Sequence, residues 1–263
     1  MQKVTSKDET KIVYEKVGTG PAVILVTGAT MTRVSFAVLA KLLSSSFTVY
    51  YYDRRGRGES SDTLPYSVEK EIEDIDALID SAGGSAYLYG ISSGACLTLL
   101  AASKLGEKVT KLAMYEAPYD EAEGAKEIWH AYRTNLQNAL SSGDMGGAVV
   151  LFMKLVGVPN DMIEGMKKSP MWPGLEKVAP TLAYDAACMG EDRSVPIEIA
   201  KNVTARTLVM DGGASKQTMP FTYDSAEKLA KAISNAKRKT IEGQSHDIDS
   251  KVLAPVLTEF FKE

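Results

Sequence analysis

The sequence has few of the residues that build metal centres and disulfide frameworks. Among 263 residues there are two histidines and two cysteines, with no HExxH motif and no CxxC pair. A metal site needs several such ligands close together, so we expect no metal ion. Cys96 and Cys188 lie far apart in the sequence. They predict free thiols in a reduced, cytoplasmic chain, with a single disulfide as the alternative.

Long apolar runs and an excess of basic residues are also missing. No run approaches the roughly 20 apolar residues of a membrane helix, and residues 1–8 lack the apolar core of a secretory signal. Lys and Arg number 30 against 34 Asp and Glu, a formal net charge of -4. We therefore expect no binding to nucleic acid or to a membrane. The Gly-x-Gly pairs at 18–20 and 56–58 lack the third glycine of a dinucleotide fingerprint, and we expect no cofactor.

What the sequence does contain is an alternation of apolar strand-like runs and amphipathic helical stretches. Residues 22–26 form a continuous apolar run, typical of a strand buried on both faces. Residues 67–82 carry apolar side chains at helical spacing, with Ser67 as the expected N-cap. Further strands are expected at 2–5, 11–17, 47–52, 85–89, 109–115, 207–211 and 237–241. This order predicts an α/β fold with a mostly parallel sheet covered by helices on both faces.

The alternation is interrupted between residues 119 and 201. That segment has no strand pattern, and it contains both tryptophans of the chain. Helical stretches are expected near 121–140, 144–157, 160–168 and 174–189. We therefore expect a core of residues 1–118 and 202–263, with residues 119–201 inserted into it as a helical cap.

The motif Gly90-Ile91-Ser92-Ser93-Gly94 lies between an expected strand and an expected helix. Gly-x-Ser-x-Gly occurs by chance in roughly one chain in ten of this length at average composition, so its position gives it most of its weight. Between a strand and a helix it is typical of a nucleophile elbow, a tight turn that exposes the serine. The serine needs a base. His246 follows the last core strand, where that base is expected, whereas His130 falls in the cap.

Together these segments resemble an α/β-hydrolase of the esterase-like group with a helical cap. The resemblance spans essentially the whole chain: the strand and turn at 26–29, the Asp-Arg-Arg-Gly-Arg-Gly-Glu-Ser loop at 53–60, the elbow, the cap and the Gly-x-x-His at 243–246. It implies an eight-stranded sheet with one early antiparallel strand. It also implies acyl transfer through a covalent acyl-serine intermediate on Ser92, which water hydrolyses.

The resemblance further implies an oxyanion hole made of two backbone N–H groups, those of Ala29 and Ser93. Many relatives carry His-Gly before the first of these donors, whereas this chain has Thr27-Gly28. A backbone donor survives that change. Loss of one such donor typically lowers kcat by about 100- to 1,000-fold.

The acid of the catalytic triad stays open between two residues. Relatives commonly place an aspartate a few positions after the strand at 207–211, but Ser215 occupies that place here. Asp211 lies at the end of this strand, and Glu116 ends the preceding core strand, where certain haloalkane dehalogenases carry their acid. We expect Glu116 to orient His246, with Asp211 as the alternative. In a further alternative neither acid contacts the histidine, and Glu116 ties down the hinge of the cap.

Three arginines in the 53–60 loop have both a phosphate-binding and a structural interpretation. Acidic residues flank them closely, which favours a locally neutralised, hydrogen-bonded turn over a nucleic-acid or phosphate site. The arginines are Arg54, Arg55 and Arg57, and the flanking acids are Asp53, Glu59 and Asp62.

The sequence therefore predicts a serine hydrolase of the carboxylesterase type, acting on small, largely apolar carboxylic esters or lactones. Its expected partner is a small-molecule ester. Candidate pocket residues, chosen because they lie near a catalytic loop or in the cap, are Met31, Tyr119, Trp129, Met219 and Phe221. Alternatives on the same fold are a non-catalytic ligand-binding protein, a cofactor-free haloperoxidase and a C–C bond hydrolase. A dehalogenase with an aspartyl nucleophile is disfavoured, because position 92 is serine.

Overall fold

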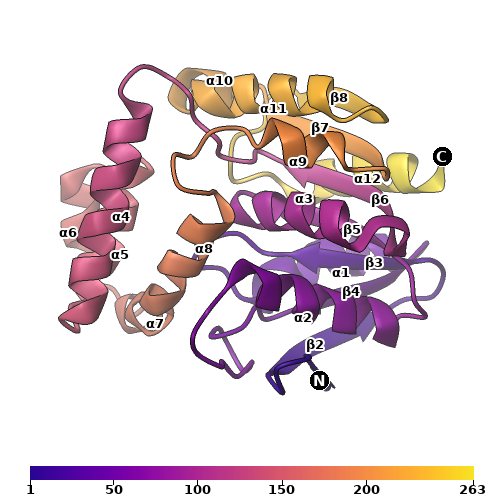
Figure 1. Ribbon diagram of the computed structural model, residues 1–263, viewed down its shortest axis with the longest axis horizontal. Coiled ribbons are helices and arrows are strands. Elements are labelled where there is room, and N and C mark those ends of the chain that lie inside the picture. The colour runs from indigo at the N-terminus through magenta and orange to yellow at the C-terminus, as the bar shows by residue number, and fades with distance from the viewer.

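The computed structural model describes residues 1–263 and contains one sheet of eight strands between two layers of helices (Figure 1). The strands are β1 (Gln2–Thr5), β2 (Lys11–Val17), β3 (Ala22–Val26), β4 (Thr48–Tyr52), β5 (Ala86–Ile91), β6 (Val109–Tyr115), β7 (Arg206–Gly212) and β8 (Ala236–Ile241). Their order in the sheet is β1-β2-β4-β3-β5-β6-β7-β8. Strand β2 is antiparallel to both of its neighbours, and every other pair is parallel. The predicted mostly parallel sheet with one early antiparallel strand is confirmed.

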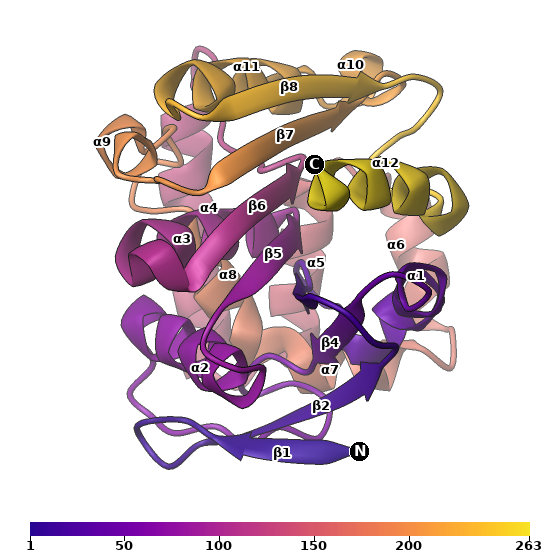
Figure 2. The same ribbon diagram turned by 90° about the vertical axis from the view of Figure 1, so that its right-hand side faces the viewer.

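Side chains of the central strands alternate between two apolar layers. In β3, Ile24 and Val26 belong to the layer formed with α2 (Val68–Ser81), α3 (Ser93–Leu105) and α11 (Pro220–Ala232). Val23 and Leu25 belong to the layer formed with α1 (Ala37–Leu43) and α12 (Ser250–Lys262), which cover the other face (Figure 2). All four side chains are fully buried, as a strand in a parallel sheet covered on both faces requires.

Helix α2 illustrates how local sequence sets an element of this layer. Its N-cap residue Ser67 has an extended backbone, and the Ser67 side chain accepts a hydrogen bond from the Lys70 backbone N–H at 3.4 Å. The apolar residues at helical spacing, among them Ile75 and Leu78, are fully buried. A capped amphipathic helix of this kind needs one apolar surface to pack against, and the sheet supplies it.

Between β6 and β7 the chain forms helices and no strand. These are α4 (Ala125–Ser141), α5 (Met145–Leu155), α6 (Asn160–Lys167), α7 (Trp172–Val178), the 3-10 helix η3 (Ala179–Thr181), α8 (Leu182–Cys188) and α9 (Ile197–Lys201). The single helix expected over 174–189 is broken at η3, because Pro180 cannot donate to an α-helical ladder. The short α9 was not predicted. The division of the chain into a core and a cap at residues 119 and 201 stays a prediction.

The helices between β6 and β7 form two groups in space. Helices α4 to α7 gather at one end of the molecule, whereas α8 and α9 pack beside α3 (Figure 1). The remaining short elements are η1 (Arg33–Phe36), η2 (Gly106–Lys108) and α10 (Ser215–Thr218). None of the helices combines the length and the apolar character needed to cross a membrane.

Candidate active site

Ser92 occupies a strained turn between β5 and α3. Its backbone angles, φ 55° and ψ -130°, lie outside the helical and extended regions and are costly for a residue with a side chain. The flanking glycines leave room for this turn. A Cβ on Gly90 would lie 2.3 Å from the Gly94 carbonyl oxygen, and a Cβ on Gly94 would lie 2.4 Å from the Val26 carbonyl oxygen. The spacing of the Gly-x-Ser-x-Gly motif is therefore required by close backbone packing.

Glu116 and His246 are in contact, and Glu116 follows Tyr115, whose carbonyl accepts the Ser92 backbone N–H at 3.0 Å. The Glu116 Oε2 atom lies 2.6 Å from His246 Nδ1. The other carboxylate oxygen, Oε1, accepts the backbone N–H of Gly212 at 2.8 Å. The Glu116 side chain is fully buried, whereas that of His246 is 36% exposed. One side of the imidazole is thus held by a fixed carboxylate while the ring still reaches solvent.

The position of Glu116 is set by the sheet. Glu116 follows β6 directly, and its backbone N–H donates to the Met210 carbonyl of β7 at 2.9 Å. Its φ of 47° is, like that of Ser92, in the left-handed region. Strained residues of this kind persist where the surrounding structure holds them, and they are concentrated at functional sites.

Asp211, the alternative acid, faces different partners. The Asp211 Oδ1 atom accepts from the Arg238 guanidinium at 3.1 and 3.0 Å, and Oδ2 accepts from the Thr240 hydroxyl at 2.9 Å. Both partners lie on β8, beside Asp211 in the sheet. Of the two acids predicted for the triad, the structure brings only Glu116 to His246. Ser215, at the position where relatives carry aspartate, is buried and its hydroxyl has no hydrogen-bond partner.

Tyr115 is a residue of the site that sequence reasoning missed. Its hydroxyl donates to the Ser245 carbonyl at 2.6 Å, one residue before His246. A Cβ on Gly212 would lie 2.5 Å from that hydroxyl oxygen, so the β7 terminus packs tightly against the same loop. The available signal was the position of Tyr115 immediately before the expected acid, since consecutive residues at a strand end can support one neighbouring loop.

The expected oxyanion donors lie on two adjoining segments. Ser93 is the first residue of α3, so its N–H has no acceptor within that helix. Ala29 follows Gly28 in the loop after β3, and a Cβ on Gly28 would lie only 3.0 Å from the Ser92 Cβ. The loop of residues 27–29 therefore packs directly on the elbow, which is the arrangement an oxyanion hole needs.

The five expected pocket residues lie in different surroundings. Met31 is half-buried, with its sulfur 3.5 Å from where a Cβ on Gly28 would lie. Tyr119 and Phe221 line a cavity of about 400 Å³ between the loop after β6 and α11. Trp129 is fully buried, and its Nε1 donates to the Gly190 carbonyl at 3.0 Å. Met219 is half-buried where α10 meets α11. A substrate-binding role for these residues stays a prediction.

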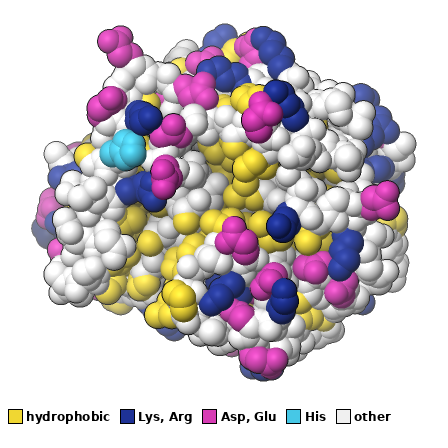
Figure 3. Space-filling view, viewed as in Figure 1, with side chains coloured by type: hydrophobic (Ala, Val, Ile, Leu, Met, Phe, Trp, Pro, Cys, Tyr) yellow, Lys and Arg dark blue, Asp and Glu magenta, His cyan; other side chains and the backbone are white.

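A second cavity opens on the face seen in Figure 3, where hydrophobic side chains gather in a hollow. It measures about 640 Å³ and is lined by Tyr119 and by residues of α2, of α3 and of the segment 187–202. Ser92 and His246 line neither this cavity nor the one beside α11. His130 is exposed on α4, and the histidine that contacts Glu116 is His246.

The arginine loop is neutralised, but the expectation of local partners was wrong. Arg54 pairs with Glu71 and Asp185, and Arg57 pairs with Asp185. Arg55 pairs with Asp74 and Asp8. Asp53, expected as a local partner, instead pairs with Arg33. All three loop arginines are fully buried, so they need partners that are themselves shielded from water. Of the acids next to them in the sequence, Glu59 and Asp62 are exposed and Asp53 is paired with Arg33.

The sequence predicts free thiols, with a single disulfide as the alternative, and no metal ion. Cys96 and Cys188 are both buried and unpaired, which matches the prediction of free thiols. Burial raises the pKa of Cys96 to about 12, because it disfavours the thiolate. No group of three or more His, Cys, Asp or Glu side chains is arranged to hold a metal ion.

Known proteins with similar sequences or structures share this architecture. The model of the alpha/beta hydrolase family matches residues 23–251. The chain is 30% identical over 210 residues to the 2-(acetamidomethylene)succinate hydrolase of Mesorhizobium japonicum, which covers 78% of this chain and 74% of that protein. It is 34% identical over 134 residues to the N-formylmaleamate deformylase of Pseudomonas putida, across 48% of this chain and 50% of that protein.

A solved structure extends the likeness to nearly the full chain. An alpha/beta hydrolase from Sphaerobacter thermophilus is 47% identical to it and superposes with a TM-score of 0.90, over 99% of this chain and 100% of that one. With the family match over residues 23–251 and the eight-stranded sheet, this establishes the relationship. The chain belongs to the alpha/beta hydrolase family.

Proposed function

We propose that this protein is a serine hydrolase that cleaves small, largely apolar carboxylic esters or lactones through an acyl-serine intermediate. The observation that carries the proposal is the 2.6 Å contact between His246 Nδ1 and Glu116 Oε2, where Glu116 follows the residue whose carbonyl accepts the Ser92 N–H. A buried carboxylate that accepts Nδ1–H leaves Nε2 as the basic atom of the imidazole. Family membership supports hydrolysis in general, and this pairing supports serine chemistry in particular.

In the proposed mechanism Ser92 attacks the carbonyl carbon while His246 Nε2 accepts the hydroxyl proton. The oxyanion that forms is stabilised by the N–H groups of Ala29 and Ser93. His246 then protonates the leaving oxygen, and the acyl group stays on Ser92. Water attacks this ester with His246 again acting as the base, which releases the acid and restores the serine.

Glu116 acts through His246 in this scheme. Its Oε1 atom is held by the Gly212 N–H, so Oε2 is fixed where it orients the ring and stabilises the imidazolium that forms during attack. The same pair argues against the alternative of a non-catalytic ligand-binding protein, because binding alone needs no buried carboxylate held against a histidine.

A second candidate is hydrolysis of a small N-acyl compound by the same acyl-serine route. The names of the two relatives support it, since one contains an acetamido group and the other an N-formyl group. A nitrogen leaving group would take its proton from His246 as an ester oxygen does. A cofactor-free haloperoxidase or C–C bond hydrolase would use the same three residues, and only the substrate distinguishes these activities.

The proposal is tested with a panel of p-nitrophenyl acetate and butyrate, a five-membered lactone and an N-formyl amide. For the preferred substrate we expect Ser92→Ala to lower kcat by about 10⁴-fold or more. Ser215→Ala is the matched control, because it removes a buried hydroxyl that makes no hydrogen bond. It should stay within about twofold of wild type. Equal activity of Ser92→Ala and wild type would exclude the serine mechanism.

A further inference from the structure

We infer that Asp185, a residue of the helical segment between β6 and β7, is a positioning residue for the oxyanion hole. Asp185 lies on α8, remote in sequence from both proposed oxyanion donors. The inference rests on the proposed function, since it concerns the same hole. It adds a residue that neither the family motif nor the triad contains.

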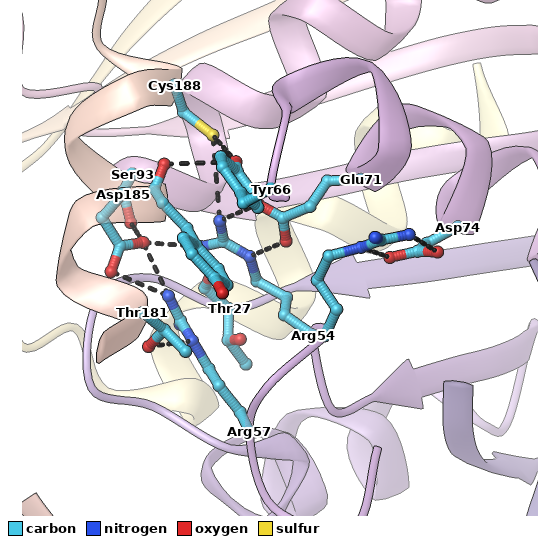
Figure 4. A network of polar contacts seen from close by, with 12 residues as sticks. Thr27, Arg54, Arg57, Tyr66, Glu71, Asp74, Ser93, Thr181, Asp185 and Cys188 are labelled. Carbon is cyan, nitrogen blue, oxygen red and sulfur yellow. Dashed lines mark hydrogen bonds and ion pairs between the residues drawn. The ribbon is translucent and has the colours of Figure 1, made fainter. Parts of the chain in front are cut away.

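The Asp185 carboxylate accepts hydrogen bonds from three side chains (Figure 4). The Asp185 Oδ1 atom accepts the Ser93 hydroxyl at 2.7 Å, although the two residues are 92 positions apart. Oδ1 also accepts Arg54 Nη1 at 2.7 Å. Arg57 Nη2 donates to Oδ1 at 2.8 Å and to Oδ2 at 2.7 Å. The first of these contacts ties Asp185 directly to the residue whose N–H is one proposed oxyanion donor.

Arg54 and Arg57 connect Asp185 to the segment that contains the other proposed donor, the Ala29 N–H. Arg57 Nη1 donates to the Gly28 carbonyl at 2.6 Å, and Arg54 Nη1 donates to the Thr27 carbonyl at 3.2 Å. The Gly28 carbonyl and the Ala29 N–H belong to the same peptide unit. Because a trans peptide is planar, its C=O and N–H point in opposite directions, and a hydrogen bond on the oxygen fixes where the N–H points. A cation on that oxygen also polarises the N–H and makes it a stronger donor.

The network is charged and closed to solvent. Arg54, Arg57, Glu71 and Asp185 are all at most 2% exposed, and two cations face two carboxylates. Burial alone would raise the pKa of Asp185, but Arg57 and Arg54 outweigh it and hold the pKa below its ordinary value. Asp185 is therefore ionised at neutral pH and keeps both arginines in place.

A contribution to folding stability alone does not explain why the protein buries this ionic network. Well-packed apolar side chains often stabilise an interior as much as a buried ion pair does, since the charges must be desolvated. A buried ionic network does fix directions, because each hydrogen bond has a required geometry. Here the fixed directions are those of the Ser93 residue and of the Gly28–Ala29 peptide. We assign Asp185 and the two arginines bound to it, which alone in the network contact the donor segments, to the alignment of these two donors.

The test compares two variants that each remove one hydroxyl from the same network. Ser93→Ala removes the direct contact with Asp185 and leaves every charge in place. Tyr66→Phe is the matched control, because its hydroxyl donates to Glu71 at 2.9 Å and contacts neither donor segment. Asp185→Asn is a third variant that removes the central charge. If it fails to fold, Ser93→Ala and Tyr66→Phe still decide the question.

The readouts are the second-order rate of Ser92 labelling by a small fluorophosphonate, kcat and KM for p-nitrophenyl acetate, and the melting temperature. We expect Ser93→Ala to lower the labelling rate and kcat by about tenfold with KM nearly unchanged, less than the loss expected for deletion of a donor. Tyr66→Phe should keep both rates within about twofold of wild type. A folded Asp185→Asn should lose about 100-fold.

Two results separate this inference from the proposed function. If wild type is labelled at Ser92 and Ser93→Ala is labelled as fast, the inference is overturned while the serine mechanism stands. The same holds if both hydroxyl deletions lower the melting temperature and change the rates equally, since that is the behaviour of a purely structural network. If folded wild type neither reacts at Ser92 nor turns over an ester, the proposed function and the inference both fail.

Discussion

Replacement of Glu116 by glutamine makes a sharp prediction, because the hydrogen bonds around Glu116 fix the orientation of the new amide. The Gly212 N–H lies 2.8 Å from Oε1 and needs an acceptor. The amide oxygen of the glutamine must therefore take that position, which turns the NH2 group toward His246 Nδ1. Nδ1 then becomes the acceptor, so the ring proton moves to Nε2, the atom that accepts the proton of Ser92 in the proposed mechanism.

The expected cost follows from this tautomer. In a serine triad, the corresponding acid-to-amide change lowers kcat by about 10⁴-fold through the same error. At 1.36 kcal/mol for each factor of ten, this is about 5.4 kcal/mol of transition-state stabilisation. KM should change little, because the lost interaction acts on His246 during attack and not on the bound substrate.

The assay measures kcat and KM of Glu116→Gln for p-nitrophenyl acetate, with a thermal melt to verify the fold. Asp211→Asn is the matched control, since Asp211 is equally buried but contacts Arg238 and Thr240 on β8. It should lower stability and leave kcat within about threefold of wild type. The reasoning is refuted if Glu116→Gln keeps more than a tenth of wild-type kcat, or if Asp211→Asn loses as much.

Three further predictions concern the supports of the site. Tyr115→Phe removes the donor to the carbonyl that precedes the histidine, so kcat and thermal stability should both fall, stability by about 1 kcal/mol; an unchanged melt and kcat would contradict the bracing role. Gly94→Ala would place a Cβ 2.4 Å from a backbone oxygen and should destabilise the fold severely in a urea titration, whereas Gly165→Ala, on an open face of α6, should stabilise it by about 0.5–1 kcal/mol. Burial would raise the pKa values of Asp185 and Glu71, but neighbouring arginines hold both below their ordinary values. The stability that these two carboxylates contribute is therefore present above about pH 4 and is lost as the pH falls further. Urea titrations from pH 7 to pH 3 should show that loss, and a free energy of unfolding that does not change with pH would be inconsistent with it.

Much of the fold and part of the site could be predicted from the sequence, because those signals are local. The apolar run at 22–26 and the helical spacing at 67–82 depend on neighbours within a few residues. Ser92 is marked by two glycines that close packing demands. Glu116 could be placed beside the site because a residue that follows a central parallel strand lies at the same edge of the sheet as the elbow.

Other features depend on contacts between distant segments and left no local signal. The arginine loop shows this, since its partners Glu71 and Asp185 lie on α2 and α8 and not beside it in the sequence. Only the packing of those helices determines which acid each arginine meets. The short α9 was missed for a related reason, because tertiary packing decides where short helical segments begin and end. The break at η3 did have a local signal, Pro180, which the prediction of one helix over 174–189 overlooked.

The proposed mechanism requires Ser92 to be an activated nucleophile. Its most direct test is the intact mass of the folded protein after exposure to a small fluorophosphonate, followed by peptide mapping. We predict one adduct, on Ser92, and a much slower reaction in Glu116→Gln, because the histidine then presents the wrong nitrogen. No adduct on folded wild type, or an adduct on a serine other than Ser92, would contradict the account.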